Sequence, residues 1–218
     1  MKILTDPRSG SYQGITSSRN RNGQYVRTRA TPVNPKSTSQ VTVRTRQSVN
    51  SAAWRGLTDA QRAGWGDLGL QMVRTDSLGQ SYNLTGFQAY CSVNNVLAQS
   101  GGTLLANAPV LAVPAGLVSV TLTLTNASFS VAYTATPLAT GVKLIFRASP
   151  QRSAGRNFES DYRVISVSAA AAASPLNVLT PYTAKFGAPV TGMKIFTLCS
   201  TTLGGFESAG FPVGQVVA

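Results

Sequence analysis

Apolar and polar residues alternate with a period of two through the C-terminal half of the chain. The alternation occurs in segments separated by Gly, Pro, Asn and Ser, at residues 118–124, 129–133, 142–146, 162–165, 182–186 and 193–198. Every second side chain of a strand lies on the same face, so each segment predicts a strand with one buried face. Repeated short strands predict an antiparallel β-sandwich of the immunoglobulin or fibronectin type III class.

Three neighbouring stretches are less regular. Residues 110–113 and 213–217 contain enough β-formers to add strands. The alanine run at 169–173 has Ser on both sides and Pro175 after it, so we interpret it as a loop or the end of a strand.

Residues 37–105 follow the helical period instead. Ser37 or Thr38 is predicted to cap a helix that runs to Arg55, and its thin apolar face follows Val41, Arg44 or Thr45, Ser48, Ala52 and Arg55. The sequence Thr58-Asp59-Ala60-Gln61 predicts a second helix that begins with a capping box. Residues 83–88 repeat this pattern before a third helix, which ends at Gly101-Gly102.

The three helices predict a small unit with its own core. The predicted core residues of this helical unit are Trp54, Leu57, Trp65, Leu68 and Phe87. The two tryptophans could instead form a binding platform, but their place at a helix joint favours a role in the core.

A basic β-hairpin is predicted near the N-terminus. Residues 11–29 contain Tyr12, Ile15, Tyr25 and Val26 as β-formers, and Asn22-Gly23 is a strong signal for a two-residue turn. The prolines of segment 31–35 impose an extended connector. The expected organisation is an α+β chain with a basic arm at 1–36, a helical unit at 37–105, a Pro-punctuated linker at 106–116 and the β-sandwich at 117–218.

The positive charge of the chain is concentrated in its first 74 residues, which include the predicted arm. The chain carries a net charge of +12, and residues 1–74 hold twelve of the nineteen Lys and Arg but three of the seven Asp and Glu, which gives +9. Arginines stand there in pairs spaced by two, namely Arg19 and Arg21, Arg27 and Arg29, and Arg44 and Arg46. Residues two apart share a face of a strand, so Arg27 and Arg29 project together, whereas Arg44 and Arg46 do so only outside a helix.

The arm has too few large apolar residues to form a core, so we expect it to lie on a partner. Guanidinium groups bind carboxylates and phosphates, so the candidates are an acidic protein surface, nucleic acid, or neighbouring copies of the same protein. Tyr12 and Tyr25 are available to stack bases. A solvated hairpin without a ligand fits the same residues.

The composition provides little for catalysis. Histidine is absent, which removes the commonest general base, and there are only seven carboxylates. Gly101-Gly102 and Gly204-Gly205 lack the spacing of phosphate-binding loops, so we interpret them as turns. We therefore expect no enzymatic activity and no cofactor.

Two further side-chain groups have simple interpretations. Cys91 and Cys199 have no partner at metal-ligand spacing and are expected to be small buried residues rather than a disulfide. Glu159 and Asp161 stand near Arg156 and Arg163, which predicts a surface ion-pair network rather than a metal or cation site. The N-terminus lacks the apolar run of a signal peptide, and no segment is apolar for long enough to span a membrane, so we expect synthesis in a cytoplasm and no membrane partner.

Three motifs follow one another in the first part of the chain. They are the basic hairpin around Arg19–Arg29, the P-x-N-P connector Pro32-Val33-Asn34-Pro35 and the W-x-x-L-T-x-x-Q-R-x-x-W helix joint between Trp54 and Trp65. In this order they resemble a group of uncharacterised phage and prophage-like proteins. Such proteins often have a fibronectin-like domain after these motifs. The match covers about the first hundred residues and identifies no catalytic residue.

The resemblance implies a structural component of a bacteriophage virion, made in the host cytoplasm. The first expectation is a capsid cement, decoration or minor capsid protein held by its basic arm, and the second is a tail or neck component. Its expected partners are other virion proteins, such as the major capsid protein, and copies of itself. An alternative from another class is a nucleic-acid-binding packaging protein whose arm faces the genome.

Overall fold

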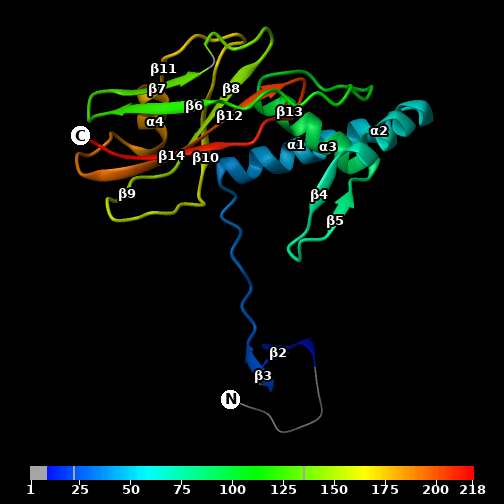
Figure 1. The fold of residues 1–218 in the computed structure, drawn as a ribbon. Coiled ribbons are helices and arrows are strands. Elements are labelled where there is room, and N and C mark those ends of the chain that lie inside the picture. The colour runs from blue at the N-terminus through cyan, green and yellow to red at the C-terminus, as the bar shows by residue number, and fades with distance from the viewer. Residues whose placement is uncertain (1–8, 22, 135) are drawn as a thin grey trace. The chain divides into compact units, whose positions relative to one another are not determined.

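The computed structural model describes residues 9–21, 23–134 and 136–218 and has an α+β fold with mostly antiparallel sheets. It forms two compact units, Met1–Thr42 and Val43–Ala218, which are described separately. Figure 1 labels its helices, which are α1 (Thr38–Arg55), α2 (Asp59–Gln71), α3 (Gly86–Gln99) and α4 (Leu179–Phe186). The strands are β1 (Gly10–Tyr12), β2 (Ile15–Asn20), β3 (Gly23–Thr28), β4 (Val73–Thr75), β5 (Ser81–Asn83), β6 (Ser119–Leu124), β7 (Phe129–Thr134), β8 (Lys143–Ala148), β9 (Arg152–Ser153), β10 (Arg163–Val167), β11 (Leu176–Asn177), β12 (Met193–Leu203), β13 (Phe206–Glu207) and β14 (Phe211–Val216).

The N-terminal unit contains a three-stranded antiparallel sheet of order β1-β2-β3, which we call the ribbon. Ile15 pairs with Thr28 and Asn20 pairs with Gly23, which confirms the predicted hairpin. The predicted turn position is wrong for Gly23, because this residue belongs to β3, and β1 is a strand that was not predicted. Asn22 of the predicted turn lies outside the described residues. Gly23 has a φ of +108°, a conformation that favours glycine. None of the described residues up to 42 is buried.

Helix α1 begins where the sequence predicted but buries a different face. The Ser37 hydroxyl accepts the Gln40 N–H at 3.4 Å, as a capping residue does. The predicted face is wrong, because its members are exposed: Val41, Arg44, Thr45, Ser48, Ala52 and Arg55. The face that packs combines polar and apolar residues. Asn50 is buried and donates to Asn95 Oδ1 at 3.0 Å, and Gln47 donates to Cys91 Sγ. Ala53 and Trp54 pack against the core of the helical region on the same helix, so hydropathy alone did not identify this side.

The other two predicted helices have the expected capping boxes. Thr58 and Gln61 bind each other's backbone N–H groups at the start of α2, and Thr85 and Gln88 do the same at the start of α3. Between these helices, β4 and β5 form a hairpin that was not predicted. The Asp76 carboxylate accepts the N–H groups of Leu78 and Gln80 at 2.8 Å each, which fixes its turn.

The predicted core of the helical region is confirmed. Trp65 and Leu68 are buried, whereas Trp54, Leu57 and Phe87 are partly buried and pack against them. The Trp65 indole N–H donates to the Ala106 carbonyl at 2.9 Å, and its ring meets that of Tyr90 edge to face with centroids 5.1 Å apart. Aromatic packing of this kind stabilises beyond the area that it buries.

Residues from distant parts of the chain complete this helical cluster. Leu105, Ala108 and Leu111, from the segment predicted as a linker and its edge, pack against it, and Phe206 of β13 belongs to it. The backbone at Gly205 lies so close to Val93 of α3 that a Cβ there would overlap the valine. The helices and the C-terminal strands therefore share a packed cluster.

The C-terminal strands form two antiparallel sheets. In one, β12 pairs with β8, β14, β13 and β9, and β8 pairs with β10; in the other, β7 lies between β6 and β11. The predicted strands near 118–124, 129–133, 142–146, 162–165 and 193–198 are confirmed, and 213–217 falls largely within β14. Segment 110–113 forms no strand, and the alanine run at 169–173 is a loop, as predicted.

The strand predicted at 182–186 is wrong, because these residues belong to helix α4. Leu179, Tyr182 and Phe186 recur at helical spacing, and the helix buries the Tyr182 ring against Phe129 with centroids 5.2 Å apart. Pro181 stands in the first turn, where its missing N–H costs no hydrogen bond. A five-residue alternation was too short to distinguish the two periods.

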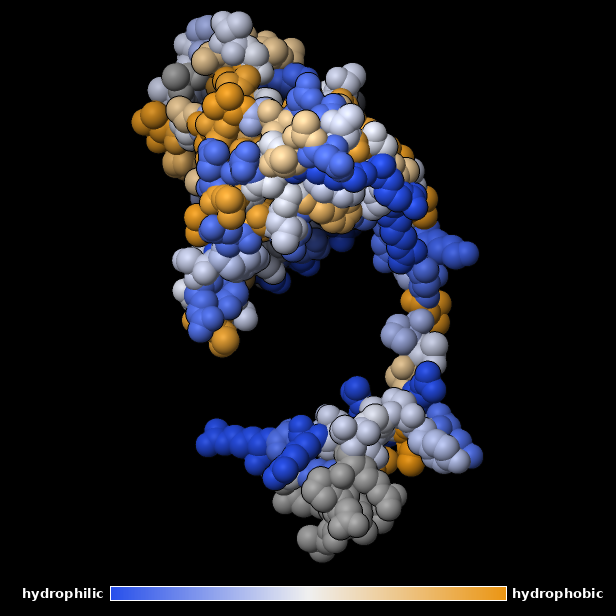
Figure 2. All heavy atoms as spheres, turned by 90° about the vertical axis from the view of Figure 1, so that its right-hand side faces the viewer, coloured by the Kyte–Doolittle hydropathy of each residue, from blue (hydrophilic) through white to orange (hydrophobic). Residues whose placement is uncertain are grey.

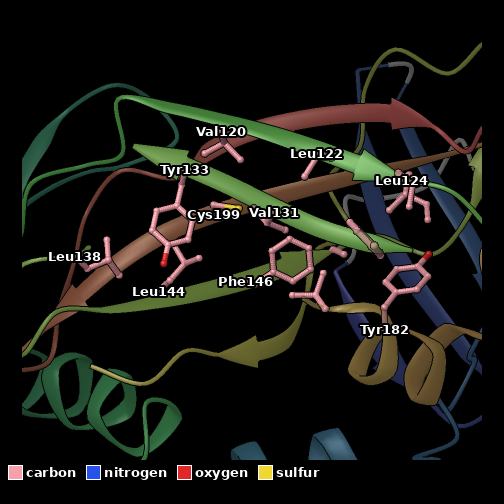
Figure 3. Close-up of a cluster of buried hydrophobic side chains, with 14 of the residues drawn as sticks. Val120, Leu122, Leu124, Val131, Tyr133, Leu138, Leu144, Phe146, Tyr182 and Cys199 are labelled. Carbon is pink, nitrogen blue, oxygen red and sulfur yellow. The ribbon is translucent and has the colours of Figure 1, made fainter. Parts of the chain in front are cut away.

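Side chains from both sheets and α4 form the larger core. Figure 3 shows Val120 and Leu122 of β6 and Val131 of β7 lying toward Leu144 and Phe146 of β8, with Tyr182 of α4 at one end. The inward-facing residues of β6 and β7 alternate with exposed or half-buried ones, as the period-two pattern predicted. This core positions the strands and loops that hold the ion pairs described below.

Candidate functional site

The pairing register of the ribbon determines the face on which each arginine lies. Arg27 pairs with Thr16 and Tyr25 pairs with Ser18, whereas Arg19 pairs with Gln24. Directly paired residues share a face and neighbours along a strand alternate, so Arg27 and Arg19 lie on opposite faces. The Arg29 N–H donates to the Gly14 carbonyl at 2.8 Å, so pairing continues beyond β3 and Arg29 shares the face of Arg27, as predicted.

The four ribbon arginines are Arg19, Arg21, Arg27 and Arg29, and all are exposed. Across the residues that the structure describes, none of these four forms an ion pair. In Figure 2 the spheres of the ribbon are mostly blue to white. The ribbon therefore offers unpaired guanidinium groups to a ligand on both of its faces.

The third arginine pair does not form a common patch. Arg44 and Arg46 lie within helix α1, where residues two apart are rotated by about 200° around the axis. Arg44 is exposed and Arg46 is half-buried, so the two side chains have different surroundings. We predicted that Arg44 and Arg46 would project together only if this segment were not helical. Because it is helical, the two side chains do not share a face.

Sequence reasoning missed an apolar surface on the ribbon. Tyr12 pairs with Ile15, and Val26 pairs with Ser17, so Tyr12, Ile15 and Val26 share the face of Arg19. Tyr12 is 72% exposed and Ile15 is 48% exposed. The period-two pattern and the hairpin register together predict that Ile15 and Val26 share a face. The position of Tyr12 on that face follows only from the pairing of β1 with β2.

The compact unit holds its charges in a different way. Arg147 of β8 binds Glu207 of β13 through two contacts, Nη1 to Oε1 at 2.5 Å and Nη2 to Oε2 at 3.0 Å. The Ser200 hydroxyl also donates to Glu207 Oε1. Burial alone would raise the pKa of Glu207, but the hydrogen bonds from Arg147 and Ser200 outweigh it and lower the pKa below its usual range. The carboxylate is thus held in its ionised form by three side-chain hydrogen bonds.

Glu159 is the centre of a second ion-pair network. Its side chain is buried and accepts the Ser160 and Asp161 backbone N–H groups at 2.9 and 3.0 Å, and Arg152 Nε at 2.5 Å. The Asp161 N–H contributes most, followed by Arg152, and together with weaker interactions they lower the Glu159 pKa to about 2. The predicted network is present, but the expectation that it lies at the surface is wrong for Glu159, because the folded loop encloses its carboxylate.

Two adjacent hollows lie on the compact unit and share Arg74 and Ser92. The larger, of about 420 Å³, lies between β4, α3, segment 111–113 and β13, and the smaller, of about 340 Å³, extends toward Tyr82 and Gln47. Glu207 lines the larger hollow but is already bound by Arg147. Cys91 lines the smaller one, and burial raises the pKa of its thiol, which keeps it protonated. These linings contain no activated nucleophile.

Other chemistry-bearing residues have structural places. Cys91 and Cys199 are free and buried, as predicted, and burial raises the pKa of Cys199 to about 12. Within the described residues, no cluster of three or more Cys, Asp or Glu side chains is arranged to hold a metal ion. None of the described helices is long and apolar enough to cross a membrane. Comparisons with models of known families, with curated proteins and with solved structures found no match.

Proposed function

We propose that this chain is a non-enzymatic structural protein of a bacteriophage virion, a capsid cement or minor capsid protein held in place by its ribbon. A tail or neck position is the alternative within the same class. The proposal combines the resemblance of the N-terminal motifs with the character of the ribbon. It also assigns residues 117–218 to an immunoglobulin-like or fibronectin-like sandwich, because two antiparallel sheets contribute to one core.

The observation that carries the proposal is the construction of the ribbon. None of its described residues is buried, and its four arginines are exposed without acidic partners among the described residues. A two- or three-stranded sheet without a buried face gains little stability by itself. Among the described strands, β3 pairs with β2 alone and takes the outer position of the sheet. These features suit a segment that becomes ordered on assembly with other proteins.

The test is incorporation into particles. Particles produced from the genome that encodes this chain are purified on a density gradient, and the chain is quantified against the major capsid protein by mass spectrometry. We expect a constant ratio across the particle peak. Absence of the chain from that peak would overturn the proposal.

Two double variants of equal charge change show whether the ribbon holds the chain. Arg19→Ala with Arg21→Ala is expected to reduce incorporation strongly, because it removes two exposed guanidinium groups of the ribbon that have no acidic partner among the described residues. Arg55→Ala with Arg74→Ala removes the same charge from exposed positions in the compact unit and is expected to leave incorporation unchanged. Equal losses in both doubles would contradict a specific role of the ribbon.

A second function, genome binding, is favoured by one observation. Arg27 and Arg29 share a face of the ribbon with the partly exposed ring of Tyr25, which combines cationic groups with a stacking surface. If the ribbon binds the genome, the association constant for duplex DNA must fall as the salt concentration rises. A plot of the logarithm of this constant against the logarithm of the salt concentration should have a slope of about −0.9 for each phosphate neutralised. Binding to DNA that does not change between low and high salt would remove this alternative.

A further inference from the structure

The two faces of the ribbon differ in chemistry. The apolar face contains Tyr12, Ile15 and Val26, with Arg19 beside them in the next paired position. The opposite face contains Ser18, Tyr25 and Arg27, and the Ser11 and Thr16 hydroxyls on it are hydrogen-bonded at 2.9 Å. One face therefore combines exposed hydrocarbon with a guanidinium group, whereas the other is largely polar and cationic.

The apolar face, with Tyr12 and Ile15 exposed and Val26 half-buried, has the character of a protein-binding surface. Tyr12 and Ile15 pair directly across β1 and β2, and Val26 lies diagonally from Ile15 across β2 and β3. Exposed hydrocarbon bordered by arginine is typical of the centre of protein interfaces, in which Tyr and Arg contribute most of the binding energy. A phosphate backbone offers no partner for Ile15 or Val26, so nucleic acid would bind the opposite face.

Most carboxylates among the described residues already have partners within the chain. Of its six described carboxylate side chains, Asp59, Glu159, Asp161 and Glu207 are each in an ion pair with an arginine of the same chain. The other two are Asp67 of α2 and Asp76, whose oxygen accepts two backbone N–H groups. With a net charge of +12, a second copy repels the ribbon more than it attracts it.

We propose that the apolar face of the ribbon docks on a different protein of the particle, at an apolar depression bordered by carboxylates. Tyr12, Ile15 and Val26 enter the depression, and Arg19 binds the carboxylate border. This inference rests on the proposed function, in which the ribbon attaches the chain to the particle. It narrows the expected partners, because neither a second copy nor the genome occupies this face.

The ribbon offers a matched pair of tyrosines for the test. Tyr12 lies on the apolar face and Tyr25 lies on the opposite face. In the full chain, each is replaced in turn by a photo-crosslinking benzophenone amino acid, and particles assembled with these chains are irradiated and purified. Mass spectrometry then identifies the peptide joined to each position. The variants Tyr12→Ser and Tyr25→Ser are assembled in parallel, and their incorporation is compared with that of the wild type.

We expect position 12 to crosslink to one virion protein other than this chain, within a peptide that contains Asp or Glu. Loss of an aromatic side chain at the centre of an interface weakens binding by about tenfold or more. When the variant chain is supplied at limiting concentration, Tyr12→Ser should therefore lower incorporation by about the same factor. Tyr25→Ser should stay within about twofold of the wild type, because surface substitutions outside a contact have small effects.

Several outcomes would overturn the inference while leaving the proposed function intact. The first is a crosslink from position 12 to a second copy or to DNA, and the second is no crosslink from position 12. The third is an equal loss of incorporation in both serine variants. Each of these counts when the wild-type chain is present in the particles. Absence of the wild-type chain from purified particles would instead overturn the proposed function, and this inference with it.

Discussion

The ribbon and the compact unit of residues 43–218 use arginine in opposite ways. In the compact unit, Arg147, Arg152 and Arg163 each bind a carboxylate, and two of the acceptors are at least partly buried. In the ribbon, four arginines are exposed and have no acidic partner among the described residues. Paired charges fix strands and loops, whereas unpaired ones are available to a ligand. Substitutions in the two regions should therefore separate folding from assembly.

The largest expected effect is in the helical cluster of the compact unit. Leu68→Ala removes a buried side chain and should lower the free energy of unfolding by about 2–5 kcal/mol. Leu70→Ala, on the same helix but 63% exposed, should change it by about 0.5 kcal/mol or less. Urea unfolding followed by tryptophan fluorescence measures both, since Trp54 and Trp65 belong to this unit. Similar losses for the two variants would contradict the placement of Leu68.

A smaller effect is expected from the half-buried ion pair between β8 and β13. Glu207→Gln leaves Arg147 without a charged partner and should lower the free energy of unfolding by about 1.5–3 kcal/mol. The matched control is Asp59→Asn, which breaks an exposed pair with Arg62 and should lower it by about 0–1 kcal/mol. The same urea titration compares them, and equal values would show that burial of Glu207 adds nothing.

Acid should weaken the compact unit through its paired carboxylates. The pKa of Glu159 is about 2 in the fold against an ordinary value of 4.5, so its contribution to stability is complete above about pH 5 and is lost as the pH falls toward 2. The lowered pKa of Glu207 acts in the same direction. Thermal unfolding of the wild type and of Glu159→Gln, at pH 7, 5 and 3, should show a smaller decline in the variant. An unchanged decline would mean that other groups dominate.

The smallest effect on stability is expected in the ribbon. Replacing Arg19, Arg21, Arg27 and Arg29 by Ala should change the free energy of unfolding of the compact unit by about 0.5 kcal/mol or less, because these side chains are exposed. The same variant should fail to enter particles. A large loss of stability in the urea titration would remove the contrast between the two regions.

Local signals in the sequence predicted much of the fold. The Thr58–Gln61 capping box and the Asn22-Gly23 hairpin signal act within a few residues, so the start of α2 and the pairing of β2 with β3 followed from chemistry close in the chain. The alternation before residue 150 predicted β6, β7 and β8 for the same reason.

Tertiary contacts account for what the sequence did not predict. The packed face of α1 contains the hydrogen bond between Asn50 and Asn95 as well as Ala53 and Trp54, and a hydropathy pattern does not identify its polar members. The two-faced ribbon depends on β1, whose pairing brings Tyr12 beside Ile15. The burial of Glu159 depends on the path of its loop, so sequence adjacency to arginines suggested only a surface network.

The packing of Phe206 and Gly205 against the helical cluster has a consequence for synthesis. Phe206 stands 107 residues after Gln99, the last residue of α3. At about 5–20 residues per second, a ribosome needs about 5–20 s to add that stretch. The helices therefore emerge well before the strand that completes their cluster. Through that interval Val93 of α3 lacks the contact with Gly205 and Phe206 that covers it in the complete fold. A chain truncated before β13 would keep this apolar surface uncovered.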